Sequence, residues 1–320
     1  MKTPIIALIF LVGVCITVFA QPSLQVMLDF FPNPNHVPLI VAVEQGFFAD
    51  EGIDVEIVVP ANPSDPIKLV AAGAVDIALT PQINLFIARD AGLPVIAIGS
   101  LIGSPLGGLL GLKENGIASL SDLRGQRIGY SLAPLEPILW CTMLASVGIE
   151  PSEYELINVG FNTVLSLLSG QVDAIGAFRN FEVPQVMLEG YEPVFFPEEE
   201  YGVPQTEEIV IAANAETVDR DAAKMRAFLA GLARGIAFTV EHPEEAFRSF
   251  VAAYPDLDDK LNRRAYEITL PLYSDGARIG SRAEWDDLQK YLFYNGLIES
   301  SFPLAEICTE EYLRKEVKER

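Results

Sequence analysis

Residues 67–101, IKLVAAGAVDIALTPQINLFIARDAGLPVIAIGSL, contain the pattern that decides the fold. Two segments with helical spacing alternate with two apolar, β-branched runs, over residues 67–72, 75–79, 84–91 and 95–101. Gly73 and Gly92 follow the two helical segments, and glycine commonly ends a helix because it adopts the left-handed conformation without strain. The alternation predicts parallel strands joined by helices.

The same pattern continues on both sides of this stretch. Before it, a predicted helix over 38–44 lies between predicted strands over 24–28 and 55–59. After a connector the alternation of strand and helix restarts, over residues 126–130, 134–147, 155–159, 164–169 and 172–178. We therefore predict an α/β protein of two lobes, each a mostly parallel sheet flanked by helices.

A short internal similarity supports two related lobes. LVAAGAVDIA at 69–78 and LLSGQVDAI at 167–175 each combine a helix end, a glycine and a strand that contains an aspartate near its start. We interpret the glycines as helix stops, and Asp76 and Asp173 as hydrogen-bond acceptors at the strand entry.

The last third of the chain is predicted to be mostly helical. A strand over 208–213 is predicted to return to the first lobe, and helices follow over 219–240, 244–253, 260–270, 282–294 and 309–317. Asp219 and Ser281 suit helix N-caps, Pro243 suits a first helical turn, and the acidic run at 198–200 is predicted to be a solvated loop. Lobe 1 then comprises residues 21–105 and about 205–320, with the C-terminal helices, and lobe 2 comprises about 106–204.

The first twenty residues have the features of an export signal. Lys2 precedes an apolar run over 5–19, and Gln21 follows it. The run is shorter than the roughly 20 residues that span a bilayer, so we predict a cleaved signal peptide at 1–20 and a periplasmic or extracytoplasmic protein. A lipid anchor at Cys15 ranks second, because Val14 stands where a lipidated cysteine is usually preceded by a smaller residue.

Composition excludes several functional classes. The net charge of -22 repels phosphate backbones, so we expect no nucleic-acid partner. With 2 histidines and 3 cysteines, the chain cannot build a Cys/His zinc cluster or a dense disulfide framework. Cys141 and Cys308 could pair in an oxidising compartment or remain two separate thiols, and the sequence leaves both open.

Polar and aromatic residues gather in the turns that follow the predicted strands, where ligands of open α/β sheets bind. These turns cover residues 29–33, 80–82, 102–104, 131–132 and 179–182. They offer aromatic faces, amides, hydroxyls and a carboxylate, which suits a flat, nitrogen-rich ring with amino groups. Ser131 lies in a partial G-x-S-x-G motif that lacks its second glycine, so a hydrolase is disfavoured.

These residues also carry a family resemblance. LDFFPNPNHVPLIVAVEQGFF at 28–48 and GAFRNFE at 176–182, with shorter segments between them, resemble the NMT1/THI5-like proteins over nearly all of the chain after residue 20. The resemblance implies a two-lobed, type II periplasmic-binding-protein-like fold. It also implies a receptor that captures an aminopyrimidine thiamine precursor and delivers it to the permease and ATPase subunits of an ABC importer.

Some fungal members of the family it resembles are instead synthases of the pyrimidine phosphate that use pyridoxal phosphate and a reactive histidine. In our alignment the synthase's cofactor lysine falls on Thr80 and its histidine on Asn84, and its cysteine-rich run falls near 202–211, which contains no cysteine. We therefore expect no enzyme and no cofactor.

The resemblance places Glu182 in an Asn-Trp-Glu motif, where it would accept from a ring amino group, while Phe181 replaces the Trp. His36 is expected to cap or pack the first helix. The predicted ligand-binding residues are Phe30, Phe31, Asn33, Thr80, Gln82, Ser104, Ser131, Asn180, Phe181, Glu182 and Tyr201. We expect a monomeric receptor for an aminopyrimidine of the hydroxymethyl or formylamino type; the alternatives are a receptor for another flat heterocycle such as riboflavin, and a thiamine-pyrimidine biosynthetic enzyme.

Overall fold

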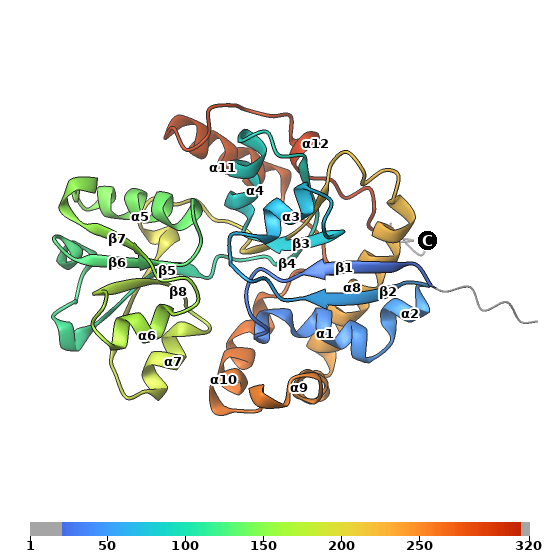
Figure 1. Ribbon diagram of the computed structural model, residues 1–320, viewed down its shortest axis with the longest axis horizontal. Coiled ribbons are helices and arrows are strands. Elements are labelled where there is room, and N and C mark those ends of the chain that lie inside the picture. The colour runs from blue at the N-terminus through green and yellow to red at the C-terminus, as the bar shows by residue number, and fades with distance from the viewer. Residues whose placement is uncertain (1–20, 315–320) are drawn as a thin grey trace, which may run out of the picture.

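The structure is a computed structural model that describes residues 21–314. Two five-stranded sheets lie side by side, each covered by helices, and together they form the two lobes in Figure 1. The predicted signal peptide at 1–20 lies outside the described residues. Within them, no helix has both the length and the apolar character needed to cross a membrane.

Lobe 1 holds the sheet of order β2-β1-β3-β10-β4. Strands β1, β2 and β3 are parallel, and β10 runs antiparallel between β3 and β4. The strand bounds are β1 Ser23–Met27, β2 Asp54–Val58, β3 Ile77–Thr80, β4 Val95–Ile102 and β10 Ile209–Asn214. One reversed strand among five confirms a mostly parallel sheet, and the predicted return of the chain to lobe 1 is confirmed by β10.

Lobe 2 repeats this arrangement in the order β7-β6-β8-β5-β9. Strands β6, β7 and β8 are parallel, and β5 runs antiparallel to both of its neighbours. The bounds are β5 Gly107–Leu112, β6 Arg127–Tyr130, β7 Glu155–Asn158, β8 Ala174–Phe178 and β9 Pro193–Pro197. The two lobes therefore share one strand topology.

Helices cover both faces of each sheet (Figure 1). Lobe 2 has α5 on one face and α6 and α7 on the other, with bounds Leu135–Ser146, Thr163–Leu168 and Glu182–Leu188. The helices of lobe 1 are α1 Val37–Glu44, α2 Phe47–Asp50, α3 Pro66–Ala71, α4 Gln82–Asp90, α8 Ala222–Glu241, α9 Pro243–Ala253, α10 Lys260–Thr269, α11 Arg282–Tyr294 and α12 Leu304–Ile307. Short 3-10 turns lie between them, and those at Pro34–His36 and Glu198–Glu200 matter for the site.

The core of lobe 1 forms where α1, α2 and α8 pack on the sheet. The rings of Phe48 and Phe228 stack with centroids 5.3 Å apart. Gly235 lets α8 approach α1 closely, because a Cβ at this position would lie 2.3 Å from the carbonyl oxygen of Pro38.

The chain crosses between the lobes twice, through residues 103–106 and 198–208. Glu208 connects the two crossings, since its Oε2 accepts hydrogen bonds from the backbone N–H of Leu106 (2.6 Å) and of Gly107 (3.1 Å). This buried carboxylate therefore ties the outgoing segment to the returning one.

The internal similarity has a structural counterpart. Oδ2 of Asp76 accepts from the backbone N–H of Gln25 at 2.8 Å, and Oδ2 of Asp173 accepts from that of Arg127 at 2.9 Å. In both lobes an aspartate just before one strand thus accepts from the backbone of its parallel neighbour, at Gln25 within β1 and at Arg127, the first residue of β6, which confirms the role predicted for both residues.

Other local predictions had mixed outcomes. Ser281 caps α11 and Pro243 lies in the first turn of α9, as predicted. Asp219 does not cap α8, which begins at Ala222; instead it accepts from the Tyr312 hydroxyl at 2.5 Å.

Two longer segments differ from prediction. The helix predicted over 309–317 is wrong for residues 309–314, where no helix forms, and 315–317 lie outside the described residues. The acidic run is not a solvated loop: Glu198 is buried, and Glu199 pairs with Arg179 at 2.7 Å. Cys141 and Cys308 are both free thiols.

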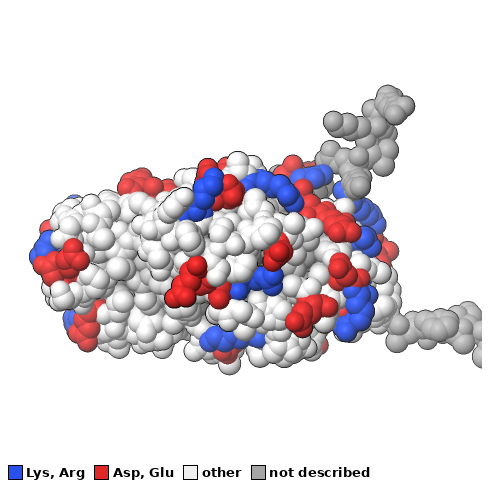
Figure 2. All heavy atoms as spheres, turned by 90° about the horizontal axis from the view of Figure 1, so that it is seen from above, with Lys and Arg blue, Asp and Glu red and all other residues white. Residues whose placement is uncertain are grey.

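Charged side chains are unevenly distributed over the face drawn in Figure 2. Figure 2 shows acidic and basic side chains interspersed over lobe 1, whereas the visible face of lobe 2 carries few charged groups. The carboxylates that matter for the site lie instead between the lobes.

Candidate ligand-binding site

Two adjoining cavities lie between the lobes. The first, which we call the ring chamber, is open to solvent and spans about 590 Å³ with that open space included; it is lined by Asp29, Phe30, Asn33, Pro63, Pro81, Ser131, Leu132, Glu136, Thr163, Gly176, Ala177, Phe178, Phe181 and Glu182. The second, the hinge chamber, spans about 460 Å³, also with its open space included, and is lined by Pro81, Gln82, Ile83, Gly107, Leu132, Leu135, Glu136, Leu139, Trp140, Ala177, Phe178, Glu198, Thr206, Glu207 and Glu208. Their shared lining makes them two parts of one interlobe cleft.

Aromatic rings from both lobes meet at the ring chamber. Phe30 of lobe 1 contacts Phe161 of lobe 2 with centroids 4.6 Å apart, and Phe31 of lobe 1 contacts Phe181 of lobe 2 at 5.8 Å. Phe30 and Phe181 line the chamber, and Phe31 supports both of them from behind. Such a wall suits one face of a flat apolar ring.

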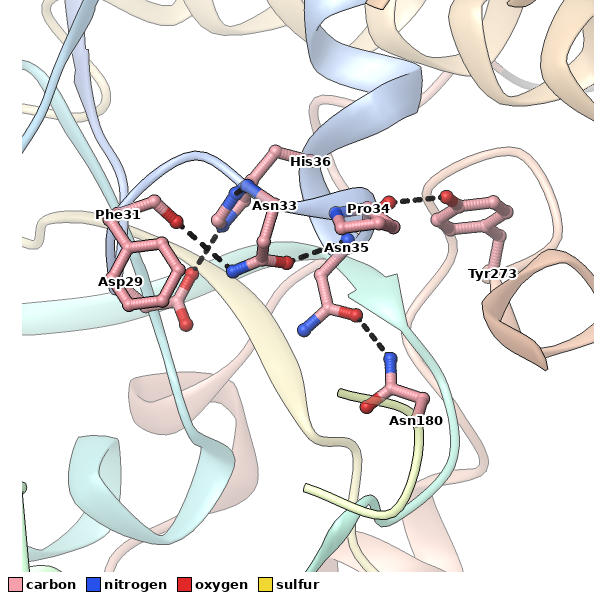
Figure 3. Close-up of polar contacts among 8 residues, drawn as sticks. All are labelled: Asp29, Phe31, Asn33, Pro34, Asn35, His36, Asn180 and Tyr273. Carbon is pink, nitrogen blue, oxygen red and sulfur yellow. Dashed lines mark hydrogen bonds and ion pairs between the residues drawn. The ribbon is translucent and has the colours of Figure 1, made fainter. Parts of the chain in front are cut away.

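The loop that carries Phe30 is held by its own side chains (Figure 3). Oδ1 of Asn33 accepts from the backbone N–H of Asn35 at 2.8 Å, and its Nδ2 donates to the carbonyl of Phe31 at 3.0 Å. The imidazole of His36 accepts from the backbone N–H of Asn33 at Nδ1 and donates from Nε2 to Oδ1 of Asp29 at 2.8 Å. His36 is therefore a structural residue of this loop, and Asp29 is the carboxylate that it fixes at the chamber wall.

Lobe 2 contributes two carboxylates opposite this loop. Glu182 begins α7, and its Oε2 accepts from the backbone N–H of Phe178 at 2.8 Å. Glu136 accepts from the N–H and the hydroxyl of Ser131 at 2.7 and 2.9 Å. Burial raises the pKa of Glu182 to about 7 and also raises that of Glu136. Each carboxylate thus supports its own loop while lining the chamber.

The hinge chamber is acidic as well. Glu198, Glu207 and Glu208 line it, and burial raises the pKa of each, that of Glu208 to about 7. The nearby guanidinium of Arg179 is paired with Glu199. In the part of the chain that the structure describes, neither chamber is lined by a lysine or an arginine, and no group of acidic, His or Cys side chains is arranged to hold a metal ion.

The structure brings about half of the predicted ligand-binding residues to the cleft. Those that line the two chambers are Phe30, Asn33, Gln82, Ser131, Phe181 and Glu182. The remaining predicted residues lie outside both linings, and these are Phe31, Thr80, Ser104, Asn180 and Tyr201.

Most residues outside the linings have other partners. Asn180 is buried between the lobes, where its Nδ2 donates to Oδ1 of Asn35 and to Oγ1 of Thr269, both at 2.7 Å (Figure 3 shows the first bond). Ser104 lies in the first crossing segment, and Tyr201 packs edge-on against Phe196.

Sequence reasoning missed most of the carboxylates. Asp29 is not among the predicted ligand-binding residues, although it lies in the opening motif and directly after a predicted strand. Glu136 is the second residue of α5 and gives no sequence signal, and Glu198 is predicted to lie in a solvated loop.

Thr80 and Asn84, where our alignment puts the synthase's cofactor lysine and reactive histidine, form a neutral pair. Nδ2 of Asn84 donates to Oγ1 of Thr80 at 3.0 Å, and both side chains are buried. Neither side chain has an amine, which could form a Schiff base, and neither has an imidazole. These residues therefore do not fit the pyridoxal phosphate of the synthases.

Comparison with known proteins identifies the family. The model of the family described as NMT1/THI5 like matches residues 33–246. The chain belongs to the NMT1/THI5-like family. A Haemophilus influenzae relative named for thiamine biosynthesis is 39% identical over 97% of this chain and 99% of its own. The formylaminopyrimidine-binding protein of Halalkalibacterium halodurans is 37% identical over 79% of this chain and 77% of its own.

Members of the NMT1/THI5-like family differ in their named roles. A Legionella pneumophila relative, 29% identical over 92% of this chain and 93% of its own, is named 4-amino-5-hydroxymethyl-2-methylpyrimidine phosphate synthase. Among solved structures, the alkanesulfonate-binding protein from Xanthomonas axonopodis pv. citri matches with a TM-score of 0.71 and 14% identity, over 92% of this chain and 99% of its own. The fold of this NMT1/THI5-like protein is therefore the predicted two-lobed, type II periplasmic-binding-protein fold.

Proposed function

We propose that this protein is the extracytoplasmic receptor of an ABC importer and binds an unphosphorylated aminopyrimidine related to the thiamine precursor, of the hydroxymethyl or formylamino type. The observation that carries the proposal is the composition of the cleft, where aromatic rings and carboxylates line the ring chamber and no lysine or arginine among the described residues does so. Phe30 and Phe181 suit the ring face, and carboxylate oxygens accept from ring amino groups. The family and its formylaminopyrimidine-binding member support the choice of ligand.

The absence of a lining cation argues against a phosphate ester. A phosphate would meet Asp29, Glu136 and Glu182 without a compensating lysine or arginine in the described residues, and an unpaired anion in a partly desolvated site is costly. The same argument separates this cleft from a site for pyridoxal phosphate or a pyrimidine phosphate product. We therefore propose a receptor and not a synthase.

The remaining parts of the proposal concern organisation. We propose that residues 1–20 are removed on export and that lobe 1 (21–105 and about 205–320) and lobe 2 (about 106–204) close on the ligand. Support for these boundaries comes from the two crossings at 103–106 and 198–208. The receptor is proposed to act as a monomer that presents the closed lobes to a permease with its ATPase.

Calorimetric titration tests which of the candidate ligands the protein binds. 4-Amino-5-hydroxymethyl-2-methylpyrimidine and its formylamino analogue should bind, and the phosphate ester of the former should bind at least 100-fold more weakly. Riboflavin serves as a flat heterocycle of different chemistry. Tight binding of the phosphate ester, or of riboflavin but neither pyrimidine, would overturn the proposal.

A turnover assay tests whether the protein is a receptor or a synthase. Incubation with pyridoxal phosphate and iron should release no pyrimidine product above a boiled control. Product formation would show that the chain is a synthase despite Thr80 and Asn84.

A further inference from the structure

We propose that Asp29 accepts a hydrogen bond from the exocyclic amino group of the ligand and that His36 is the positioning residue that holds this carboxylate in place. The inference deepens the proposed function and rests on it. It makes a ring amino group the feature by which lobe 1 recognises its ligand.

The carboxylate of Asp29 is the lobe 1 acid of the ring chamber. It follows the last residues of β1, and its side chain is 10% exposed. One oxygen, Oδ1, accepts from Nε2 of His36 at 2.8 Å. The other oxygen is thus available to a donor in the chamber, and a carboxylate oxygen is a strong acceptor there because the site is partly shielded from water.

His36 can hold only one orientation in this loop. Its side chain is 0% exposed, and its two ring nitrogens have different partners. Nδ1 accepts from the backbone N–H of Asn33 at 3.2 Å, which places the ring hydrogen on Nε2 and directs it to Asp29. A rotation of the ring would break both hydrogen bonds, so the imidazole keeps the carboxylate from turning out of the chamber.

The same loop carries the aromatic wall. Asn33 ties the loop to itself through Asn35 and Phe31, and Phe30 lies next to Asp29 in the chain (Figure 3 shows these ties). Neighbouring residues of one rigid segment would therefore contact both the face of the ligand ring and its amino group. Preorganisation of this kind improves selectivity because little ordering is needed on binding.

Across the chamber, Glu182 and Glu136 belong to lobe 2. A ring with more than one N–H can donate to Asp29 from one side and to a lobe 2 carboxylate from the other. An oxo or hydrogen substituent at the amino position leaves Asp29 without its donor, and an unpaired buried acceptor costs affinity. The site should therefore select amino-substituted heterocycles.

The test is a selectivity ratio. 4-Amino-5-hydroxymethyl-2-methylpyrimidine and the same molecule without its amino group are titrated into each variant, and the ratio of the two Kd values is compared. In wild type the amino compound should bind at least tenfold more tightly. In Asp29→Asn the ratio should fall at least fivefold, because His36 would hold the amide oxygen and turn the NH₂ group towards the ligand amino group.

His36 variants separate positioning from folding. His36→Phe removes both hydrogen bonds and should lower the ratio, whereas His36→Gln supplies an acceptor and a donor and should restore part of it. His242→Gln, at the exposed second histidine, is the matched control and should leave the ratio unchanged. An unchanged ratio in Asp29→Asn overturns the role of Asp29, and equal losses for both compounds in His36→Phe, which leave the ratio at its wild-type value, overturn the role of His36. If neither compound binds wild type, the proposed function itself fails.

Discussion

Asn180 of lobe 2 donates from Nδ2 to Oδ1 of Asn35 in lobe 1 at 2.7 Å, and this hydrogen bond is buried between the lobes. The same Nδ2 donates to Oγ1 of Thr269, which also belongs to lobe 1. Asn35 Nδ2 and Asn180 Oδ1 have no partner among the described residues. The contact therefore holds the lobes together, but its net contribution is reduced by two unpaired polar atoms.

Asn180→Ala should weaken this interlobe contact. The loss of about 1 kcal/mol of hydrogen bonding should shift the free protein towards an open form and reduce the apparent affinity for the pyrimidine about fivefold. Small-angle scattering of the free protein and calorimetry with ligand measure the two effects. Asn115→Ala, at an exposed position of lobe 2, is the control. Identical scattering from Asn180→Ala and wild type would show that the contact does not bias closure.

Glu182→Gln should reduce ligand affinity while leaving the fold intact. The glutamine oxygen can still accept from the backbone N–H of Phe178, so its NH₂ group would face the chamber and oppose a ligand amino group. A charge-assisted hydrogen bond of about 1.5–3 kcal/mol is lost, which predicts a decrease of about tenfold or more.

Titration and melting of the same samples distinguish the two roles of Glu182. Glu189→Gln at the exposed end of α7 is the matched control. Wild-type affinity together with a lower melting temperature in Glu182→Gln would make the carboxylate a helix-end residue without a part in binding.

Stability should decrease as pH rises from about 5 to 8. Burial raises the pKa of Glu208 and of Glu182 to about 7, above the ordinary value of 4.5 for a glutamate. Between these values the folded protein binds more protons than the unfolded chain, so the free energy of unfolding falls as pH increases through the window. Asp173, whose pKa is lowered by Arg127, has the opposite effect but below this range.

Melting curves in a pH series check this prediction. We expect a melting temperature higher at pH 5.5 than at pH 8 by on the order of 2–4 °C, the shift that about 1 kcal/mol produces in chains of roughly this size. Glu208→Gln should flatten the dependence, and the exposed Glu245→Gln should not. A melting temperature that climbs steadily to pH 8 would contradict the raised pKa values.

Gly235→Ala should destabilise lobe 1. In an ordinary helix interior this change stabilises by up to about 1 kcal/mol. Here the new Cβ would lie 2.3 Å from the carbonyl oxygen of Pro38 and 2.9 Å from Cβ of Ala42, so α1 and α8 must separate at a cost of about 1–3 kcal/mol. Thermal unfolding gives the sign, and an increase in stability would show that the two helices pack less closely.

The regular elements could be predicted because their periodicity and their end signals agree. Helix α11, with Ser281 at its N-cap, has the predicted bounds, and most strands fall within a residue or two of prediction. Strand β5 was missed because three glycines in Gly107–Leu112 hide its pattern. The close packing of the neighbouring strand requires glycine here, since a Cβ at Gly108 would lie 2.3 Å from the carbonyl oxygen of Phe196 in the next strand.

The site was harder to predict because its residues depend on the packing of one lobe on the other. The turn after β8 was correctly recognised as polar, yet Glu182 lines the chamber while Asn180, two residues earlier, faces Asn35. The sequence predicts an exposed Glu198, because two other glutamates follow it. The side chain is instead buried over Gly107, and a Cβ added at Gly107 would lie 2.5 Å from Oε2 of Glu198. Local periodicity shows neither which side chain of this turn lines the chamber nor that Glu198 is buried.

The position of β10 sets an order in which the molecule can assemble. Lobe 2 completes its sheet from one uninterrupted segment, β5 to β9, whereas β10 separates β3 from β4 and pairs Ile209 with Ile102. The lobe 1 sheet therefore stays divided until the chain beyond lobe 2 has arrived, and closing so long a loop is slow unless the intervening residues are already compact. A mutation that retards folding of lobe 2 should consequently delay lobe 1 as well, although it lies far from that lobe's core.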